Sequence, residues 1–171
     1  MRKVFRVFLI TAVIAVSAVY SVSASNTATL NIQVTVPKTV AISVESTSYA
    51  ENLDFSDDPR DVHLGTVREM SNSFDGYKVF LTSENASSDQ STHAFFASSD
   101  GSSSAKIPYV LSYGGEVVNF DGGTAKVTDL TGTLAVGRGN EREVRLVNLD
   151  RSAMPDPGAY SDTLTFTIAA N

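Results

Sequence analysis

The sequence predicts an all-β protein folded as two packed sheets. Short segments in which apolar and polar residues alternate recur along the chain, and they are rich in Val, Thr, Tyr and Phe. Gly, Asp and Asn separate these segments, as turns require, and no segment shows a helical period. Between the two ends of the chain, the alternating segments are residues 77–84, 106–120, 131–137 and 142–149. Several short strands divided by turns are typical of a β-sandwich.

The first 24 residues have the pattern of a secretory signal peptide. Three cations, Arg2, Lys3 and Arg6, precede an uncharged apolar run, and small residues at 22–24 predict cleavage after Ala24. The alternative is an uncleaved membrane anchor, but residues 7–24 are interrupted by Thr and Ser and are short for a span. The chain has no cysteine, which excludes a lipoprotein anchor. We therefore expect an exported protein.

The mature chain, residues 25–171, has a length that suits one domain. Removing the three leader cations leaves ten of the 13 Lys and Arg residues against 19 Asp and Glu, a formal charge of −9. A chain this acidic gains nothing from the counterion release that drives nucleic-acid binding. Since it also lacks disulfides, its stability must come from a core, from a partner, or from both.

The mature chain begins with two strand patterns placed end to end. Residues 29–36 alternate, Pro37 follows, and a second alternation begins at Val40 with no turn between them. The apolar members of the first pattern are Leu30, Ile32, Val34 and Val36. From the residues alone, two interpretations stay open. Residues 29–36 either pair with another chain, or they form the first strand of their own domain, with a kink at Pro37.

The C-terminal segment, residues 160–170, predicts one long strand that follows a turn at Gly158. Its two faces differ, as in a strand with one buried and one solvated side. The apolar face carries Tyr160, Leu164, Phe166, Ile168 and Ala170, and Asp162 interrupts that series. Residues 87–104, eight of them serine, predict instead a solvated loop with a short apolar plug at Phe95 and Phe96.

Motifs for catalysis or metal binding are weak. The S-x-x-K match at Ser103–Lys106 has none of its companion motifs, and the two histidines, His63 and His93, have no metal-ligand spacing. The acidic stretch 54–61 lacks the calcium-loop frame and predicts a solvated turn, and residues 119–123 predict another turn. Tyr77, Tyr109 and Tyr113 suit a sandwich core better than a sugar-binding surface. We therefore expect no enzyme, no metal and no cofactor.

Taken together, the leader, the doubled N-terminal pattern and the closing G-x-Y-x-D-x-L-x-F-x-I segment resemble a chaperone–usher fimbrial (pilin) subunit. The resemblance is strongest to the cysteine-free major pilins of colonisation-factor fimbriae. Residues 107–118 resemble the mid-chain strand pair of those subunits, and Gly158 is fourteenth from the C-terminus, where pilins commonly carry glycine. The closing segment is also similar to secreted proteins of the spore-coat-U type.

The resemblance implies an immunoglobulin-like sandwich, residues 38–171, that lacks its final strand. Residues 25–37 would then be a donor extension whose Leu30, Ile32, Val34 and Val36 fill the groove of a neighbouring subunit. The groove edge, which a periplasmic chaperone grips before assembly, would be Gly158, Tyr160, Leu164, Phe166, Ile168 and Asn171. The implied partners are other copies of the subunit, the chaperone and an outer-membrane usher, and the destination is a surface fimbria reached through the periplasm.

The resemblance leaves open whether the subunit belongs to a shaft or a tip, and which receptor it binds. The alternative function is a self-complete secreted β-sandwich, either a coat protein or a carbohydrate-binding adhesin module.

Overall fold

A computed structural model describes residues 29–57, 59–131, 139–153 and 155–171. The chain divides into two units, one ending at Thr35 and a folded unit from Val36 to Asn171. The signal peptide expected at 1–24 and most of the strand expected at 131–137 lie outside the described residues. Within the described residues, no helix has the length and apolar character needed to cross a membrane.

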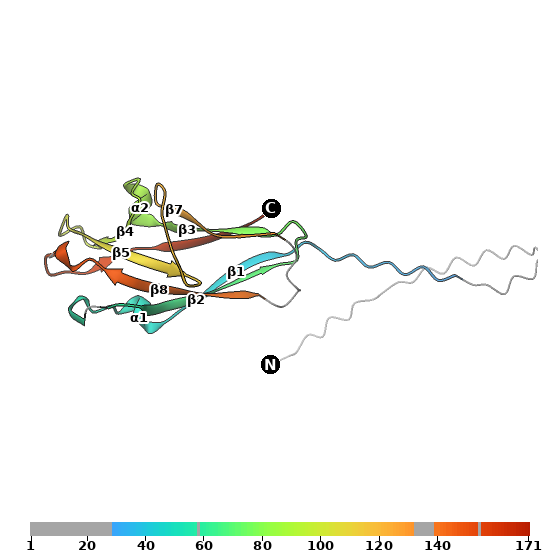
Figure 1. Ribbon diagram of the computed structural model, residues 1–171, viewed down its shortest axis with the longest axis horizontal. Coiled ribbons are helices and arrows are strands. Elements are labelled where there is room, and N and C mark those ends of the chain that lie inside the picture. Colours follow the sequence, from blue (N-terminus) through green and yellow to red (C-terminus); the bar gives the residue numbers. More distant parts are fainter. Residues whose placement is uncertain (1–28, 58, 132–138, 154) are drawn as a thin grey trace, which may run out of the picture. The chain divides into compact units, whose positions relative to one another are not determined.

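The folded unit consists of two antiparallel sheets (Figure 1), which confirms the all-β prediction. The larger sheet has the order β1-β2-β8-β5-β4-β9, with β6 paired to β5. Its strands are β1 (Val40–Ser46), β2 (Val62–Ser71), β8 (Asn140–Leu149), β5 (Lys106–Tyr113), β4 (Ala94–Ser98), β9 (Tyr160–Ser161) and β6 (Glu116–Val117). The smaller sheet has the order β10-β3-β7, made of β10 (Leu164–Ala170), β3 (Tyr77–Ser83) and β7 (Thr124–Leu130).

Helices are few and short. They are α1 (Ser48–Glu51), α2 (Glu84–Ser88) and the 3-10 turns η1 (Phe55–Asp57) and η2 (Arg151–Ala153). The N-cap of α2 is Ser83, whose hydroxyl accepts from the amide of Ala86 at 3.1 Å. The turn predicted at 119–123 is present and is closed by a bridge between Asp121 and Thr124.

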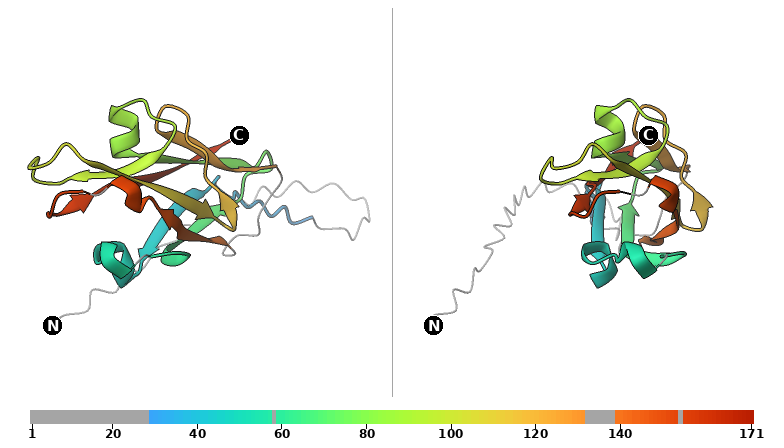
Figure 2. Two further views of the ribbon diagram at one scale, coloured as in Figure 1. Left: turned by 60° about the vertical axis from the view of Figure 1, so that its left-hand side comes forward. Right: turned by 90° about the vertical axis from the view of Figure 1, so that its left-hand side faces the viewer.

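The core contains side chains from both sheets, which face each other in Figure 2. In β3, Tyr77, Val79 and Leu81 are fully buried and alternate with partly exposed residues, which is the period of a strand with one core face. The larger sheet contributes Val67 of β2 and Leu146 of β8, both also fully buried. Full burial of each such aliphatic side chain stabilises the fold by roughly 1.5–3 kcal/mol.

Three strands, β2, β7 and β4, are not among those predicted from the sequence. β4 lies inside the solvated loop expected at 87–104, and that prediction is wrong in two places. Residues 87 and 88 end α2, and Ala94–Ser98 forms β4, paired with β5 and with Ala94 and Phe95 buried. Phe95 and Phe96 therefore belong to a strand that is anchored within the sheet, and the serine-rich stretches only flank it.

The long C-terminal strand predicted at 160–170 is also wrong, because the chain changes sheets at Asp162. Tyr160 and Ser161 pair with β4 in the larger sheet, whereas β10 pairs with β3 in the smaller one. Asp162, which interrupts the apolar series in the sequence, holds this crossing in place through its carboxylate.

Candidate functional site: an open groove between two strand edges

Two strands of the folded unit end their sheets side by side without pairing to each other. Among the described strands, β1 pairs only with β2, and β10 pairs only with β3. β1 and β10 nevertheless lie close together, so the edge of one sheet faces the edge of the other. An unpaired edge exposes a row of backbone donors and acceptors and is a template for another strand.

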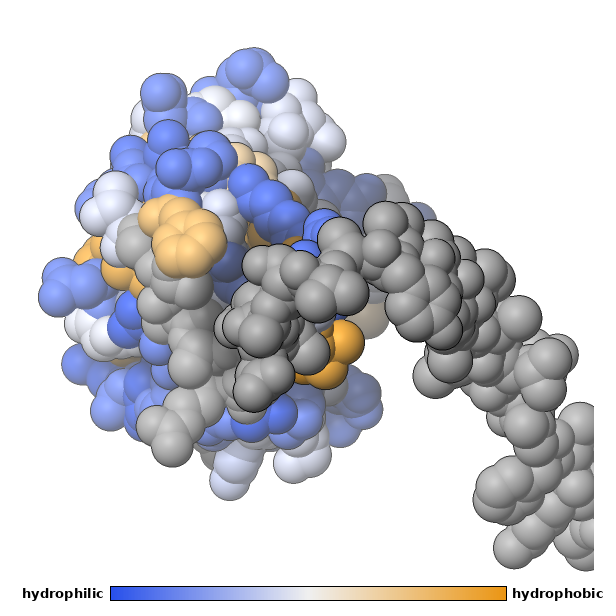
Figure 3. Space-filling view, turned by 90° about the vertical axis from the view of Figure 1, so that its right-hand side faces the viewer, coloured by the Kyte–Doolittle hydropathy of each residue, from blue (hydrophilic) through white to orange (hydrophobic). Residues whose placement is uncertain are grey.

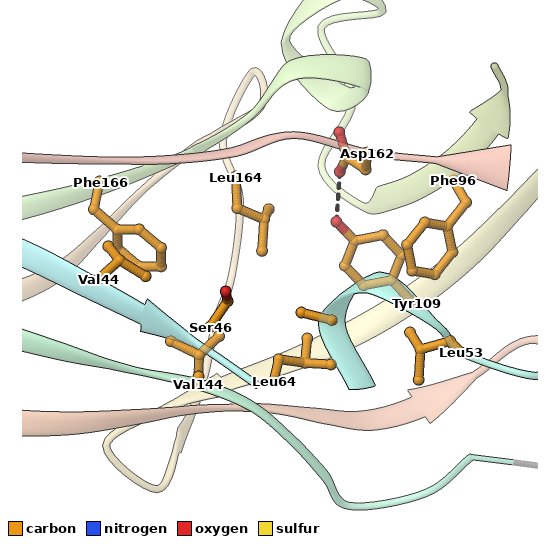
Figure 4. Close-up of a pocket in the computed structure, with 12 residues that line it drawn as sticks. Val44, Ser46, Leu53, Leu64, Phe96, Tyr109, Val144, Asp162, Leu164 and Phe166 are labelled. Atoms are coloured by element: carbon orange, nitrogen blue, oxygen red, sulfur yellow. Dashed lines mark hydrogen bonds between the residues drawn. The ribbon is translucent and has the colours of Figure 1, made fainter. Parts of the chain in front are cut away.

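A cavity of about 230 Å³ lies between these two edges. Val44 and Ser46 of β1 line one side, and Leu164 and Phe166 of β10 line the other (Figure 4). The remaining walls are mainly apolar and come from α1, from residue 53 and from strands of the larger sheet: Ala50, Leu53, Leu64, Gly65, Phe96, Tyr109 and Val144, together with Asp162. Since an engineered cavity of about 150 Å³ binds benzene, this one has room for more than one branched aliphatic side chain.

The cavity continues past the start of β10. A second cavity of about 500 Å³ shares Ala50, Leu53, Phe96 and Asp162 with the first. It extends to Phe55, Ile107, Leu149, Gly158 and Tyr160. We call the two cavities together the groove. It follows the first part of β10, at Leu164 and Phe166, and continues past Asp162 to β9 and Gly158; we call the part at Gly158 its open end.

The apolar face of β10 is only partly covered. Leu164, Phe166 and Ile168 remain partly exposed, and Val44 on the opposite edge is 51% exposed, whereas the neighbouring Leu81 is fully buried. Phe166 stacks on Tyr113 with 5.8 Å between ring centroids. The groove therefore exposes side chains of the core itself, which a complete sandwich would cover.

The predicted groove residues fall into three places. Tyr160, Leu164 and Phe166 line the groove, and Gly158 lies at its open end. Ile168 continues the same face of β10 beyond the cavity. Asn171 is not in the groove, because its side-chain amide donates to the carbonyls of Asp75 and Leu130 and fastens the end of β10.

Asp162 forms a polar anchor beside the groove. One carboxylate oxygen accepts from the backbone amides of Asn85 at 3.1 Å and Thr163 at 2.9 Å. The other accepts from the hydroxyl of Ser83 at 2.6 Å and from the hydroxyl of Tyr109. Burial, reinforced by the adjacent carboxylate, raises the pKa of Tyr109 well above its usual value. Donors from β3, α2 and β5, together with the adjacent amide of Thr163, thus fix the point where the chain leaves one sheet for the other.

A second buried carboxylate, Glu69, lies between the sheets. It is fully buried and accepts from three hydroxyls: Tyr77 at 2.9 Å, Tyr113 at 2.5 Å and Thr128 at 2.7 Å. Burial, followed by the hydrogen bond to Glu69, raises the pKa of Tyr77 to about 12. The same causes raise the pKa of Tyr113 further. This cluster links β2, β3, β5 and β7, and neither sequence periodicity nor a motif pointed to it.

The predicted donor residues lie outside the sheets. Residues 29–39 form no strand, and Leu30, Ile32, Val34 and Val36 are 83%, 86%, 84% and 69% exposed. The chain just before β1 is held by Asn72, whose side chain donates to the carbonyl of Pro37 at 2.8 Å and accepts from the amide of Thr39 at 2.6 Å. The amide of Asn72 also donates to the carbonyl of Thr39. Thr39 therefore extends the pairing of β1 and β2 by one residue.

The other candidate residues have ordinary structural partners. The hydroxyl of Ser103 donates to Asp156 at 3.0 Å, whereas Lys106 pairs with Asp89 and lies 4.7 Å from the Phe95 ring centroid. His63 contacts the Gly65 carbonyl at 2.9 Å, and His93 contacts Thr92 at 3.0 Å.

In the acidic stretch 54–61, Asp61 pairs with Arg145 at 2.6 Å. No cluster that could hold a metal occurs among the residues that the structure describes.

The prediction of core tyrosines is confirmed, because Tyr77, Tyr109 and Tyr113 are at most 5% exposed. That burial overturns the sugar-binding surface considered for them.

No protein-family model and no curated protein matches this chain. The geometry of the groove and the exposed N-terminal alternation are therefore the features that bear on function.

Proposed function

We propose that the chain is a structural subunit of a surface fimbria that polymerises by donor-strand complementation. The observation that carries the proposal is the open apolar groove between the unpaired edges of β1 and β10. In this account the folded unit is an immunoglobulin-like sandwich lacking its last strand, and residues 25–37 of a second copy supply it. β-Strand addition of this kind gains backbone hydrogen bonds and places alternate side chains in pockets.

The donor and β10 have similar lengths, but only Leu164 and Phe166 of β10 line the groove. Because β1 and β10 come within 8 Å of each other and neighbouring strands lie about 4.8 Å apart, an inserted donor strand must push the two edges apart. Residues 29–36 span about 27 Å when extended, and the seven residues of β10 span about 24 Å. The four donor side chains are largely exposed, so their insertion buries surface that the subunit alone leaves in water. At roughly 1.5–3 kcal/mol each, these side chains together contribute on the scale of a whole domain's stability of about 5–15 kcal/mol.

Self-insertion is disfavoured by the chain just before β1. For residues 29–36 to enter their own groove, the chain would have to reverse direction at residues 37–39. Asn72 instead holds Pro37 and Thr39 in line with β1 through three hydrogen bonds. A reversal would break those bonds, whereas insertion into another copy leaves them intact.

The remaining parts of the proposal follow from the exposed groove. An unfilled groove exposes core side chains and two strand edges, which favours aggregation. A periplasmic chaperone that lends a strand during transit, and an usher that exchanges it for the next subunit, would protect the groove until assembly.

The test is a pair of substitutions in the full chain. Ile32→Asp should abolish polymers, because an unpaired carboxylate would enter an apolar cavity, while the folded unit keeps its circular dichroism spectrum. Gln33→Asp is the matched control, since its side chain points away from the groove and polymers should persist. Size-exclusion chromatography and electron microscopy read the result. Equal polymerisation of the two variants would refute the proposal.

A further inference from the structure

The folded unit carries an exposed aromatic residue next to the point where the extension leaves it. Phe74 is 87% exposed and lies in the turn between β2 and β3, two residues after Asn72, which binds Pro37 and Thr39. We call residues 72–76 together with 37–39 the root. Figure 3 looks onto this end of the molecule, where a few hydrophobic side chains lie among hydrophilic ones.

The turn that carries Phe74 is rigidly built. The amide of Gly76 donates to the carbonyl of Ser73 at 3.2 Å, and Gly76 has a φ of +85°. A Cβ at Gly76 would lie 1.9 Å from the carbonyl oxygen of Leu130, so only glycine fits. Asn171 donates from its backbone amide to the Gly76 carbonyl and from its side chain to the Asp75 carbonyl. The ring of Phe74 is therefore held out from a turn that is fastened on both sides.

Strand direction determines which surface Phe74 meets, and this step rests on the proposed function. β10 begins at the open end of the groove and ends at the root, where Asn171 binds Gly76. A donor antiparallel to β10 would place its own Val36 at the open end, so its folded unit would lie beyond that end. Copies then stack head to tail without closing, as a fibre requires. A parallel donor would bring root against root and close a two-fold dimer.

The short link between donor and folded unit makes this contact tight. Only Pro37, Lys38 and Thr39 separate Val36 from β1, so the Cα atoms of Val36 and Val40 can lie at most about 14 Å apart. With Val36 in the groove of the next copy, the root must lie against the open end of that groove. There the 500 Å³ cavity carries Phe55, Gly158 and Tyr160 on its walls.

We infer that Phe74 of each copy docks at the open end of the groove of the next copy, against the wall formed by Phe55 and Tyr160. The contact would be a second interface, apolar and separate from the inserted strand. It would fix the angle between consecutive subunits, because the turn that carries Phe74 is rigid and the link is short.

Paired cysteines test the contact, since the natural chain has none. In purified full-length protein, Phe74→Cys and Gly158→Cys are introduced together. A Cβ at Gly158 meets only ordinary contacts of 3.7 Å and 3.9 Å, so that substitution is accommodated. A disulfide requires Cα atoms within about 7 Å, and the two positions lie at opposite ends of one copy. Mild oxidation should therefore give a ladder of covalent oligomers on a non-reducing gel.

Two further variants separate the outcomes. Phe74→Cys with Lys126→Cys, an exposed position on β7, should lose the ladder. Phe74→Cys alone should give no covalent dimer, and a dimer would indicate root-to-root packing and overturn the inference. If the protein polymerises but the Gly158 pair gives no more ladder than the Lys126 pair, the inference is wrong while the proposed function stands. If no polymer forms, both fail.

Discussion

Replacing Asp162 by alanine should destabilise the folded unit severely, although the residue lies beside a groove that is open to solvent. The substitution removes the acceptor of four hydrogen bonds, from Ser83, Asn85, Tyr109 and Thr163. The hydroxyls of Ser83 and Tyr109 belong to residues that are at most 5% exposed. A buried donor without a partner costs about 1–3 kcal/mol.

Two such donors, together with the less buried amides, predict a loss of about 3–5 kcal/mol, a large part of a total of about 5–15 kcal/mol. Urea denaturation followed by circular dichroism measures this loss. Tyr109→Phe is the matched variant. It removes one donor and leaves the carboxylate with three partners, so it should cost about 1–2 kcal/mol.

In the double variant, the two losses should not add, because both substitutions act on one network. Asp156→Ala, at an exposed position, is the negative control. A loss below 1 kcal/mol for Asp162→Ala, or strict additivity with Tyr109→Phe, would refute the assigned role of the carboxylate at the crossing between sheets.

Two other measurements test the faces of β10 and the buried tyrosines. Phe166→Ala should lower the free energy of unfolding by up to about 3–5 kcal/mol, since the ring packs on Tyr113 and lines the groove. Thr165→Ala, on the exposed face, should change it by no more than about 0.5 kcal/mol. Equal losses in thermal melts would mean that the two faces are misassigned. Stability should also fall above pH 10. The pKa of Tyr77 rises to about 12 and those of Tyr109 and Tyr113 rise as well, so the unfolded chain loses these protons first. The contribution is complete below pH 10 and is lost as pH rises through the folded values. Denaturation midpoints between pH 8 and 12 measure it, with tyrosinate absorbance as a second probe; a flat profile would contradict the buried network.

Strands with a regular exposed side were predictable from the sequence, and strands determined by tertiary contacts were not. In β3, strict alternation reflects one core face and one partly exposed face. β8 alternates only as far as Leu146, because an irregularity in its pairing with β5 comes before the buried Leu149. β4 has only five residues with two consecutive buried ones, Ala94 and Phe95, so it lacks a period that sequence analysis detects. Its serine-rich flanks made it look like a loop.

The groove was predictable from the sequence in composition but not in shape. Leu164 and Phe166 were assigned to one apolar face, and both line the groove. That β10 joins the smaller sheet while β9 joins the larger depends on Asp162 and its partners from β3 and β5, which are far away in the sequence. The Glu69 cluster likewise joins four strands, and single-sequence patterns do not report such long-range hydrogen bonds.

The central claim is that the groove accepts residues 25–36 of another copy, and a peptide of that sequence tests it most directly. The acceptor is a chain beginning at Lys38, which keeps every strand of the folded unit. Because the peptide would bind only the native state, saturation at 100 times its Kd should add about 2.7 kcal/mol of stability. For a domain of this size, each kcal/mol raises the Tm by about 3–5 °C. A peptide with Ile32→Asp should give no rise, and one with Gln33→Asp should act like the natural sequence. A truncated chain whose Tm is unchanged by the natural peptide would contradict the account.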